Sequence, residues 1–181
     1  MTTHSANKAE PGAAVTAAPD GKRELTRALT HGAVGGLLAG MVFAGMTMWF
    51  MASQGVPTKL PLLAIATILQ GDESLGTASP ALGAVSHVVL SMAFGAAFAM
   101  VALRLRLRTD AMVILVGALY GAVLYAMNFV LLGNAAFDVF TRFNQPFQVL
   151  NHTVFGVLTA LIMAVWQQYS RRANPVNRSV R

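Results

Sequence analysis

Apolar residues along the chain are gathered into four long blocks, and charged residues are confined to the tails and to the segments between the blocks. The blocks cover about residues 33–51, 81–103, 111–132 and 147–166, and each is free of Asp, Glu, Lys and Arg. At a rise of about 1.5 Å per residue, each block can cross a hydrocarbon core of about 30 Å. Backbone groups inside lipid must be paired within their own segment, which only helices of this length achieve. The pattern predicts an all-α membrane protein, a four-transmembrane-helix bundle over residues 31–168.

The segments outside the blocks predict three further parts. Residues 1–30 are rich in Ala, Thr, Pro and Gly and have no sustained apolar period, which indicates a disordered tail, with a helix just before the membrane as the alternative. Residues 169–181 form a basic tail. The first long connection contains an outer segment, residues 57–71, with an apolar run too short to cross a bilayer. This run suits either a helix lying in the outer leaflet or a short helix packed over the mouth of the bundle.

Basic residues predict the orientation of the chain. Eleven of the 13 Lys and Arg residues lie in the two tails and in the link between the second and third blocks, while only Lys59 and Arg142 lie on the other side. Short positively charged segments stay in the cytoplasm, so we expect both termini to be cytoplasmic.

Composition narrows the classes of protein and partner. The chain is 55% hydrophobic and only 11% charged, whereas soluble domains carry roughly 25% charged residues. The net charge of +6 does not indicate a nucleic-acid partner, because the basic residues lie beside apolar blocks and set orientation. The absence of cysteine excludes disulfides and thiolate metal sites. We expect the lipid bilayer as the main partner, with a membrane-protein partner or a homo-oligomer left open.

The blocks also resemble one another in pairs, which predicts an internal two-helix repeat. The first block aligns with the third at an offset of 81 residues, and the second aligns with the fourth at an offset of 65. His87 and His152 occupy corresponding positions, and each is followed by a small residue at every fourth position. Small residues four apart lie on one helix face and let helix backbones approach closely. We expect helix packing at Gly36, Gly40, Gly95, Gly117, Gly121 and Gly156.

Three motifs carry a resemblance to a known family. They are the glycine-rich first block with its Met-Thr pair (Gly36 to Thr47), the Pro- and Leu-containing outer segment (Pro57 to Gly71), and His87 ahead of Phe94-Gly95. Together they resemble the YagU-like four-helix bacterial inner-membrane proteins over residues 31–168. The resemblance implies a fold and a location in the bacterial inner (cytoplasmic) membrane, and it brings no catalytic residue, cofactor or ligand.

Polar residues inside the blocks are the candidates for chemistry. His87 and His152 enter from the outer side, and Thr47 and Asn128 reach a similar depth from the inner side, with Asn151 beside His152. The pattern favours interhelical hydrogen bonds from the two histidines to Asn128, Thr47 or the backbone. Two alternatives stay open: His87 and His152 as cofactor-binding ligands of a haem or metal, and a pocket for a small ligand. Two histidines without a carboxylate or cysteine make a poor metal site.

No sequence motif for catalysis is present, so we do not expect an enzyme. The sequence favours an integral membrane protein of structural or accessory type, such as a small subunit of a membrane complex. The alternatives are a haem-, metal- or ligand-binding module centred on His87 and His152, and a small transporter. Coupled transport is the weaker of these, because no ionisable Asp, Glu, Lys or Arg lies at mid-membrane depth.

Overall fold

The computed structural model describes residues 20–107 and 109–173, and the regular structure within these residues is helical. In chain order the elements are α1 (Asp20–Ser53), α2 (Leu60–Gln70), η1 (Asp72–Ser74), α3 (Pro80–Arg104), α4 (Asp110–Tyr125), η2 (Ala126–Leu131), α5 (Leu132–Ala135), η3 (Asp138–Arg142) and α6 (Gln145–Ala173). The elements η1 and η3 are 3₁₀ helices, whereas η2 is a π-helical stretch within the third long helix.

The prediction of four membrane-spanning helices is confirmed by length and composition. Among the described residues, the segments long and apolar enough to cross a membrane are Gly21–Ser53, Pro80–Arg104, Asp110–Ala135 and Gln145–Trp166. Each contains one of the predicted blocks. Side chains mark two of the helix starts: the Ser79 hydroxyl accepts from the backbone N–H of Leu82, and the Thr109 hydroxyl accepts from that of Met112.

In the part of the tail nearest the membrane the structure follows the helical alternative, because residues 20–30 form the first turns of α1. The hydroxyls of Thr26 and Thr30 donate to backbone carbonyls four residues earlier, at 2.9 Å. Extending a helix that already exists avoids the cost of nucleation, so a polar segment without an apolar period continues the spanning helix. Similarly, residues 169–173 of the predicted basic tail belong to α6. Residues 1–19 and 174–181 lie outside the described residues.

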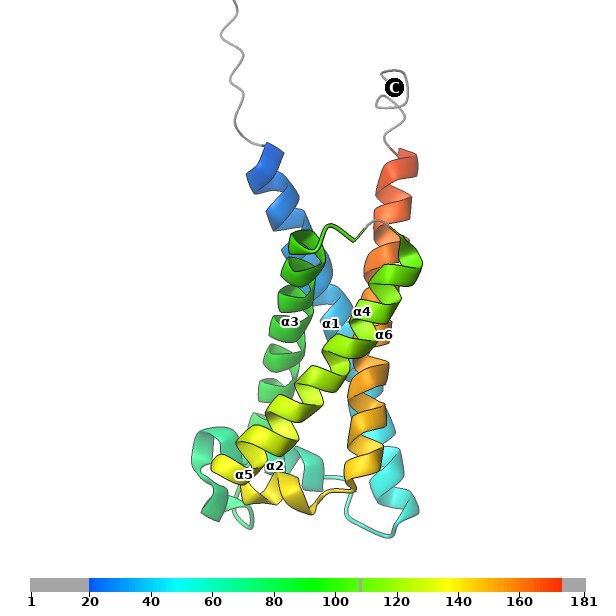
Figure 1. Ribbon diagram of the computed structural model, residues 1–181. Helices are drawn as coiled ribbons and strands as arrows, with labels where there is room; N and C mark the ends of the chain where they lie inside the picture. The colour runs from blue at the N-terminus through cyan, green and yellow to red at the C-terminus, as the bar shows by residue number, and fades with distance from the viewer. Residues whose placement is uncertain (1–19, 108, 174–181) are drawn as a thin grey trace, which may run out of the picture.

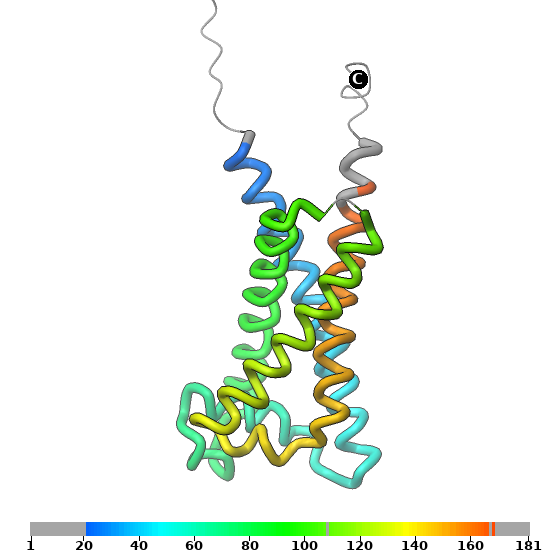
Figure 2. Tube along the Cα trace, viewed as in Figure 1, coloured from blue at the N-terminus to red at the C-terminus, as the bar shows by residue number. Residues whose placement is uncertain are grey.

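The long helices run alongside one another, and the start of α1 and the end of α6 lie at the same end of the bundle (Figure 1). We call this the tail end. The short elements α2, η1, α5 and η3 gather at the opposite end, which we call the loop end (Figure 1). The trace can be followed in Figure 2, where α1 descends from the tail end and α3 returns to it.

Small residues bring α1 and α3 together backbone to backbone. A Cβ atom added at Gly36 would lie 2.8 Å from the Cα of Gly95. One added at Gly40 would lie 2.6 Å from the Cβ of Ser91. These distances are shorter than real Cβ contacts, so this seam requires glycine at both positions.

The same kind of seam joins α4 to α6. A Cβ atom added at Gly117 would lie 2.6 Å from the Cβ of Ala160, and one added at Gly121 would lie 2.8 Å from the Cα of Thr153. One added at Gly156 would lie 2.9 Å from the backbone nitrogen of Gly121. The α1/α3 and α4/α6 pairs are then joined to each other through α1 and α6.

The outer segment 57–71 contains α2, which packs against the start of α3. A Cβ atom added at Gly83 would lie 2.6 Å from the carbonyl carbon of Leu62, so the two backbones are in close contact. Pro61, Ala64, Ala66 and Thr67 are buried by this packing. Of the two sequence alternatives, the structure favours a short helix packed over the mouth of the bundle.

Candidate functional site

A cavity of about 340 Å³ lies between the loop-end halves of the long helices and α2. Its wall is mostly apolar, and many of the lining side chains are aromatic. The aromatic members are Phe43, Phe94, Phe129, Phe137, Phe140, Phe143 and Phe155. The polar members are Thr47, His87, Ser91, Asn128, Gln148 and His152. The four polar residues expected at one depth, Thr47, His87, Asn128 and His152, therefore line a single cavity.

His87 reaches the cavity from α3, and its ring is fixed by α1. The Nε2 atom of His87 lies 2.9 Å from the carbonyl oxygen of Gly40, 47 residues earlier. A carbonyl oxygen can only accept, so Nε2 carries the proton and donates. Gly40 allows this approach, because a Cβ atom there would meet the side chain of Ser91.

His152 reaches the cavity from α6 and is 5% exposed. Its Nδ1 atom donates to the carbonyl oxygen of Gln148 over 2.8 Å, one turn earlier on the same helix. Its ring lies among other rings, with centroids 4.8 Å from Phe43 and 5.2 Å from Phe129. Phe43 also contacts His87, at a centroid distance of 5.8 Å. One phenylalanine ring of α1 therefore touches both histidines.

The predicted polar cluster divides into two parts. Asn151 is fully buried, and its Nδ2 atom donates to the Thr47 hydroxyl at 2.8 Å and to the Phe43 carbonyl at 3.1 Å. This pair of bonds ties α6 to α1, and Asn151 is not part of the cavity wall. Asn128, in contrast, lines the cavity from η2. Of the partners expected for the histidines, the structure uses the backbone: His87 donates across helices to the carbonyl of Gly40, whereas His152 donates within α6 to that of Gln148.

Two buried amide oxygens have no hydrogen-bond partner among the described residues: Oε1 of Gln148 and Oδ1 of Asn151. Gln148 is 1% exposed and lines the cavity. A buried polar atom without a partner is costly, by roughly 1–3 kcal/mol. The wall of the cavity therefore includes a side chain whose accepting capacity is unused.

The third long helix is π-helical where it passes the cavity. Met127, Asn128 and Phe129 belong to η2 and line the cavity. A π-helical turn holds an additional residue, so neighbouring side chains change their direction relative to a regular α-helix. Such turns occur frequently at functional sites.

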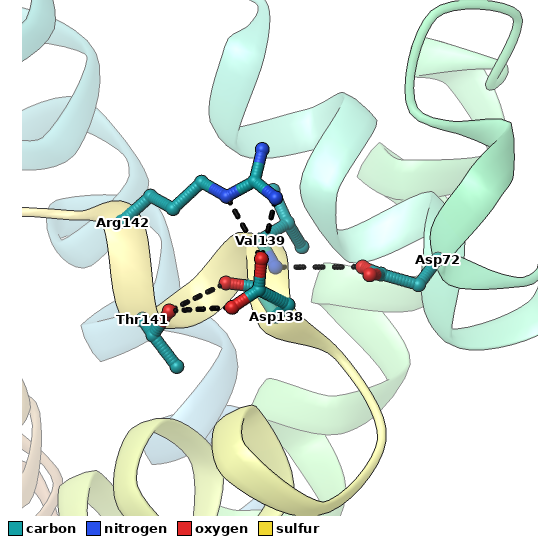
Figure 3. Close-up of polar contacts among 5 residues, drawn as sticks. All are labelled: Asp72, Asp138, Val139, Thr141 and Arg142. Carbon is teal, nitrogen blue, oxygen red and sulfur yellow. Dashed lines mark hydrogen bonds and ion pairs between the residues drawn. The ribbon is translucent and has the colours of Figure 1, made fainter.

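Side chains from the loops hold the loop end together (Figure 3). Asp138 pairs with the guanidinium of Arg142 and accepts from the hydroxyl of Thr141 at 3.0 Å. The carboxylate of Asp72 accepts from the backbone N–H of Val139 at 3.4 Å, which connects η1 to η3. The hydrogen bond from Arg142, followed by that from Thr141, holds the pKa of Asp138 below its ordinary value.

The described residues were compared with the ligand sets of metal sites and the chain with known proteins. Among the described residues, no three His, Cys, Asp or Glu side chains come together as a metal site needs. Comparisons of the chain with protein-family models, curated proteins and solved structures gave no match. Any function proposed for this protein therefore depends on the residues of the cavity itself.

Sequence reasoning missed several residues of the site. Phe43 and Gln148 were not singled out, because a phenylalanine in an apolar block and a glutamine at a block edge carry no distinctive signal. The π-helical turn was also missed, because Ala126–Leu131 contains neither Gly nor Pro to mark a break in the helix. The one usable signal was depth: polar residues at equal depth on several helices indicated the layer in which the cavity lies.

Proposed function

We propose that this protein is a multi-pass integral membrane protein that binds a small, largely apolar ligand in the cavity. The observation that carries the proposal is a cavity of about 340 Å³ into which two helices each contribute a histidine. Ligand sites are typically apolar cavities of about 300–1,000 Å³ with a few polar groups that orient the ligand. Polar side chains are costly inside a membrane, so their convergence on one cavity favours a function over packing alone.

The exposure of the cavity wall supports entry from the lipid. Three lining residues are partly exposed on the outer surface of the helices: Ile68 (38%), Met127 (46%) and Leu132 (43%). They belong to α2, η2 and α5, where the bundle surface is apolar. A lipid-soluble molecule can therefore reach the cavity without crossing water.

The proposed role is accessory. The cavity wall carries no carboxylate and no lysine or arginine, the side chains that most often couple binding to ion movement. We propose a subunit or helper of a membrane complex that holds a ligand, in preference to a small transporter. The resemblance to the YagU-like family stays a prediction.

Orientation and duplication belong to the same proposal. Basic residues of the described helices and of the link between α3 and α4 cluster at the tail end, which supports cytoplasmic termini in a bacterial inner membrane; they are Lys22, Arg23, Arg27, Arg104, Arg106, Arg171 and Arg172.

The proposed repeat is supported by corresponding contacts. Gly36 meets Ser91 and Gly95 in one helix pair, and their counterparts Gly117, Gly156 and Ala160 meet in the other.

A second candidate is axial ligation of a haem or metal by His87 and His152. One observation favours it: each imidazole donates one N–H to a carbonyl, which is how ligating histidines are commonly oriented. The size of the cavity and the pairing of Arg142 with Asp138, which removes a cation for a haem propionate, favour a smaller ligand. A Soret band in the purified protein that either His87→Ala or His152→Ala abolishes would replace our first proposal with this one.

Photolabelling tests the proposed function. The protein in lipid nanodiscs is irradiated with 3-azioctanol, an aliphatic alcohol bearing a diazirine, and the labelled residues are mapped by mass spectrometry. We expect labels on cavity residues, reduced several-fold by excess 1-octanol. Leu90→Trp, which fills the cavity, should abolish this saturable labelling, whereas Leu115→Trp on the 62% exposed lipid-facing surface should preserve it. Labels spread over lipid-facing residues without competition would contradict the proposal.

A further inference from the structure

Hydrogen bonds to the backbone fix which nitrogen of each imidazole is protonated. Nε2 of His87 and Nδ1 of His152 both donate to carbonyl oxygens. No carboxylate lines the cavity, and an unpaired charge on the buried ring of His152 would be costly, so this ring is neutral. In a neutral imidazole the second nitrogen is an acceptor. Nε2 of His152 is therefore left with one lone pair.

The lone pair on Nε2 of His152 meets no hydrogen-bond donor among the described residues. The rings of Phe43 and Phe129 beside it have no polar hydrogen to donate. The α6 side of the cavity thus includes an acceptor, Nε2 of His152, without a partner in the protein.

Two other polar residues of the cavity wall, Ser91 and Asn128, favour neither a donating nor an accepting ligand. The hydroxyl of Ser91 and the amide of Asn128 can each donate or accept, so they adapt to either kind of ligand. A carbonyl or ether oxygen placed against Nε2 of His152 would set one lone pair against another. A hydroxyl or N–H group there would make a hydrogen bond in an apolar surrounding, where such bonds are strong.

We propose that the ligand's polar group is a hydrogen-bond donor, a hydroxyl or N–H on an apolar body, which is received by Nε2 of His152. The proposal rests on the proposed function and names the class of molecule that the cavity binds. It distinguishes alcohols, phenols and amides with a free N–H from ethers and esters of the same size.

A matched pair of competitors tests the proposal. Cavity labelling by 3-azioctanol is competed with 1-octanol and with 1-methoxyoctane, its methyl ether, at equal mole fraction in the nanodisc lipid. We expect the alcohol to compete about tenfold better, the effect of one satisfied buried acceptor. His152→Phe keeps an aromatic ring but removes the acceptor, so the two competitors should become equal. His31→Phe is the control, because the ring of His31 lies beside Trp166 at the tail end. This variant should retain the preference for the alcohol.

The outcomes separate the two proposals. Equal competition by alcohol and ether in the wild-type protein overturns the donor requirement and leaves the binding cavity standing. A preference that persists in His152→Phe also overturns it. Labelling outside the cavity that no competitor reduces overturns the proposed function together with this inference.

Discussion

The amide of Asn151 donates a 2.8 Å hydrogen bond to the hydroxyl of Thr47, and this bond joins two helices whose residues are 104 positions apart. The hydroxyl of Thr47 in turn donates to the carbonyl of Phe43 at 2.9 Å. The network therefore holds the backbone of Phe43, whose ring contacts both histidines. It is the main polar connection between α1 and α6 among the described residues.

We expect Asn151 and Thr47 to be energetically coupled. In a double-mutant cycle of Asn151→Ala and Thr47→Val, the interaction free energy of unfolding should be about 0.5–1.5 kcal/mol, the range of hydrogen bonds between membrane helices. Unfolding in mixed detergent micelles measures it. Thr30→Val serves as the control, because Thr30 lies on the same helix and bonds only to its own backbone. Equal coupling of Asn151 with Thr30 and Thr47 would contradict the network.

The glycine seam is tested by adding a single methyl group. Gly36→Ala should lower the unfolding free energy by about 1–3 kcal/mol, because its Cβ would meet the backbone of Ser91 and Gly95. The matched control is Gly45→Ala on the same helix, where no atom lies within 4 Å of an added Cβ. That substitution should be neutral or slightly stabilising, since alanine favours a helix over glycine. Similar losses in both variants would mean that close packing does not explain the small residues at every fourth position of this helix.

The loop end should show a pH dependence in the acid range. The pKa of Asp138 is lowered in the folded protein, so its pairing with Arg142 stabilises fully above the ordinary pKa of Asp, about 3.9. This stabilisation is lost as the pH falls through the lower, folded-state pKa. A carbon-13 NMR titration of the Asp138 carboxyl group should show the lowered value in the wild type and a rise towards the ordinary value in Arg142→Gln. The same pKa in both proteins would contradict the pairing.

Orientation is tested with reporters. A reporter active in the cytoplasm should be active when fused after residue 181, and an export-dependent reporter should be active when inserted near Asp72. The physical reason is that positively charged segments resist translocation, and basic residues cluster at the tail end. The reverse pattern of activities would place the cavity near the inner surface.

The four long helices were predictable because membrane spans depend on simple quantities. Length and the absence of charge identified each block, and small residues four apart identified the faces that pack. Both signals are local in sequence and do not depend on which neighbour is present. For residues 20–30 the sequence left both disorder and helix open, because their composition lacks an apolar period, whereas their structure follows from the helix they extend.

The cavity could be located in depth but not in shape. Thr47, His87, Asn128 and His152 were expected in one layer, and they line one cavity. The backbone was among the partners expected for the histidines, but the particular carbonyls were not predictable, since every residue offers one equally. The role of Gln148 depends on the turn of α6 that it shares with His152, and its unpaired oxygen appears only once the whole wall is assembled.

The pairing of α1 with α3 and of α4 with α6 has a consequence for biogenesis. Each seam joins helices that leave the ribosome in succession, so the first pair can close before the second pair is synthesised. The cavity cannot form at that stage, because His87 belongs to the first half and His152 to the second. Two separately expressed fragments, divided in the link between α3 and α4, should therefore each insert, and the cavity should bind its ligand only when both fragments are present.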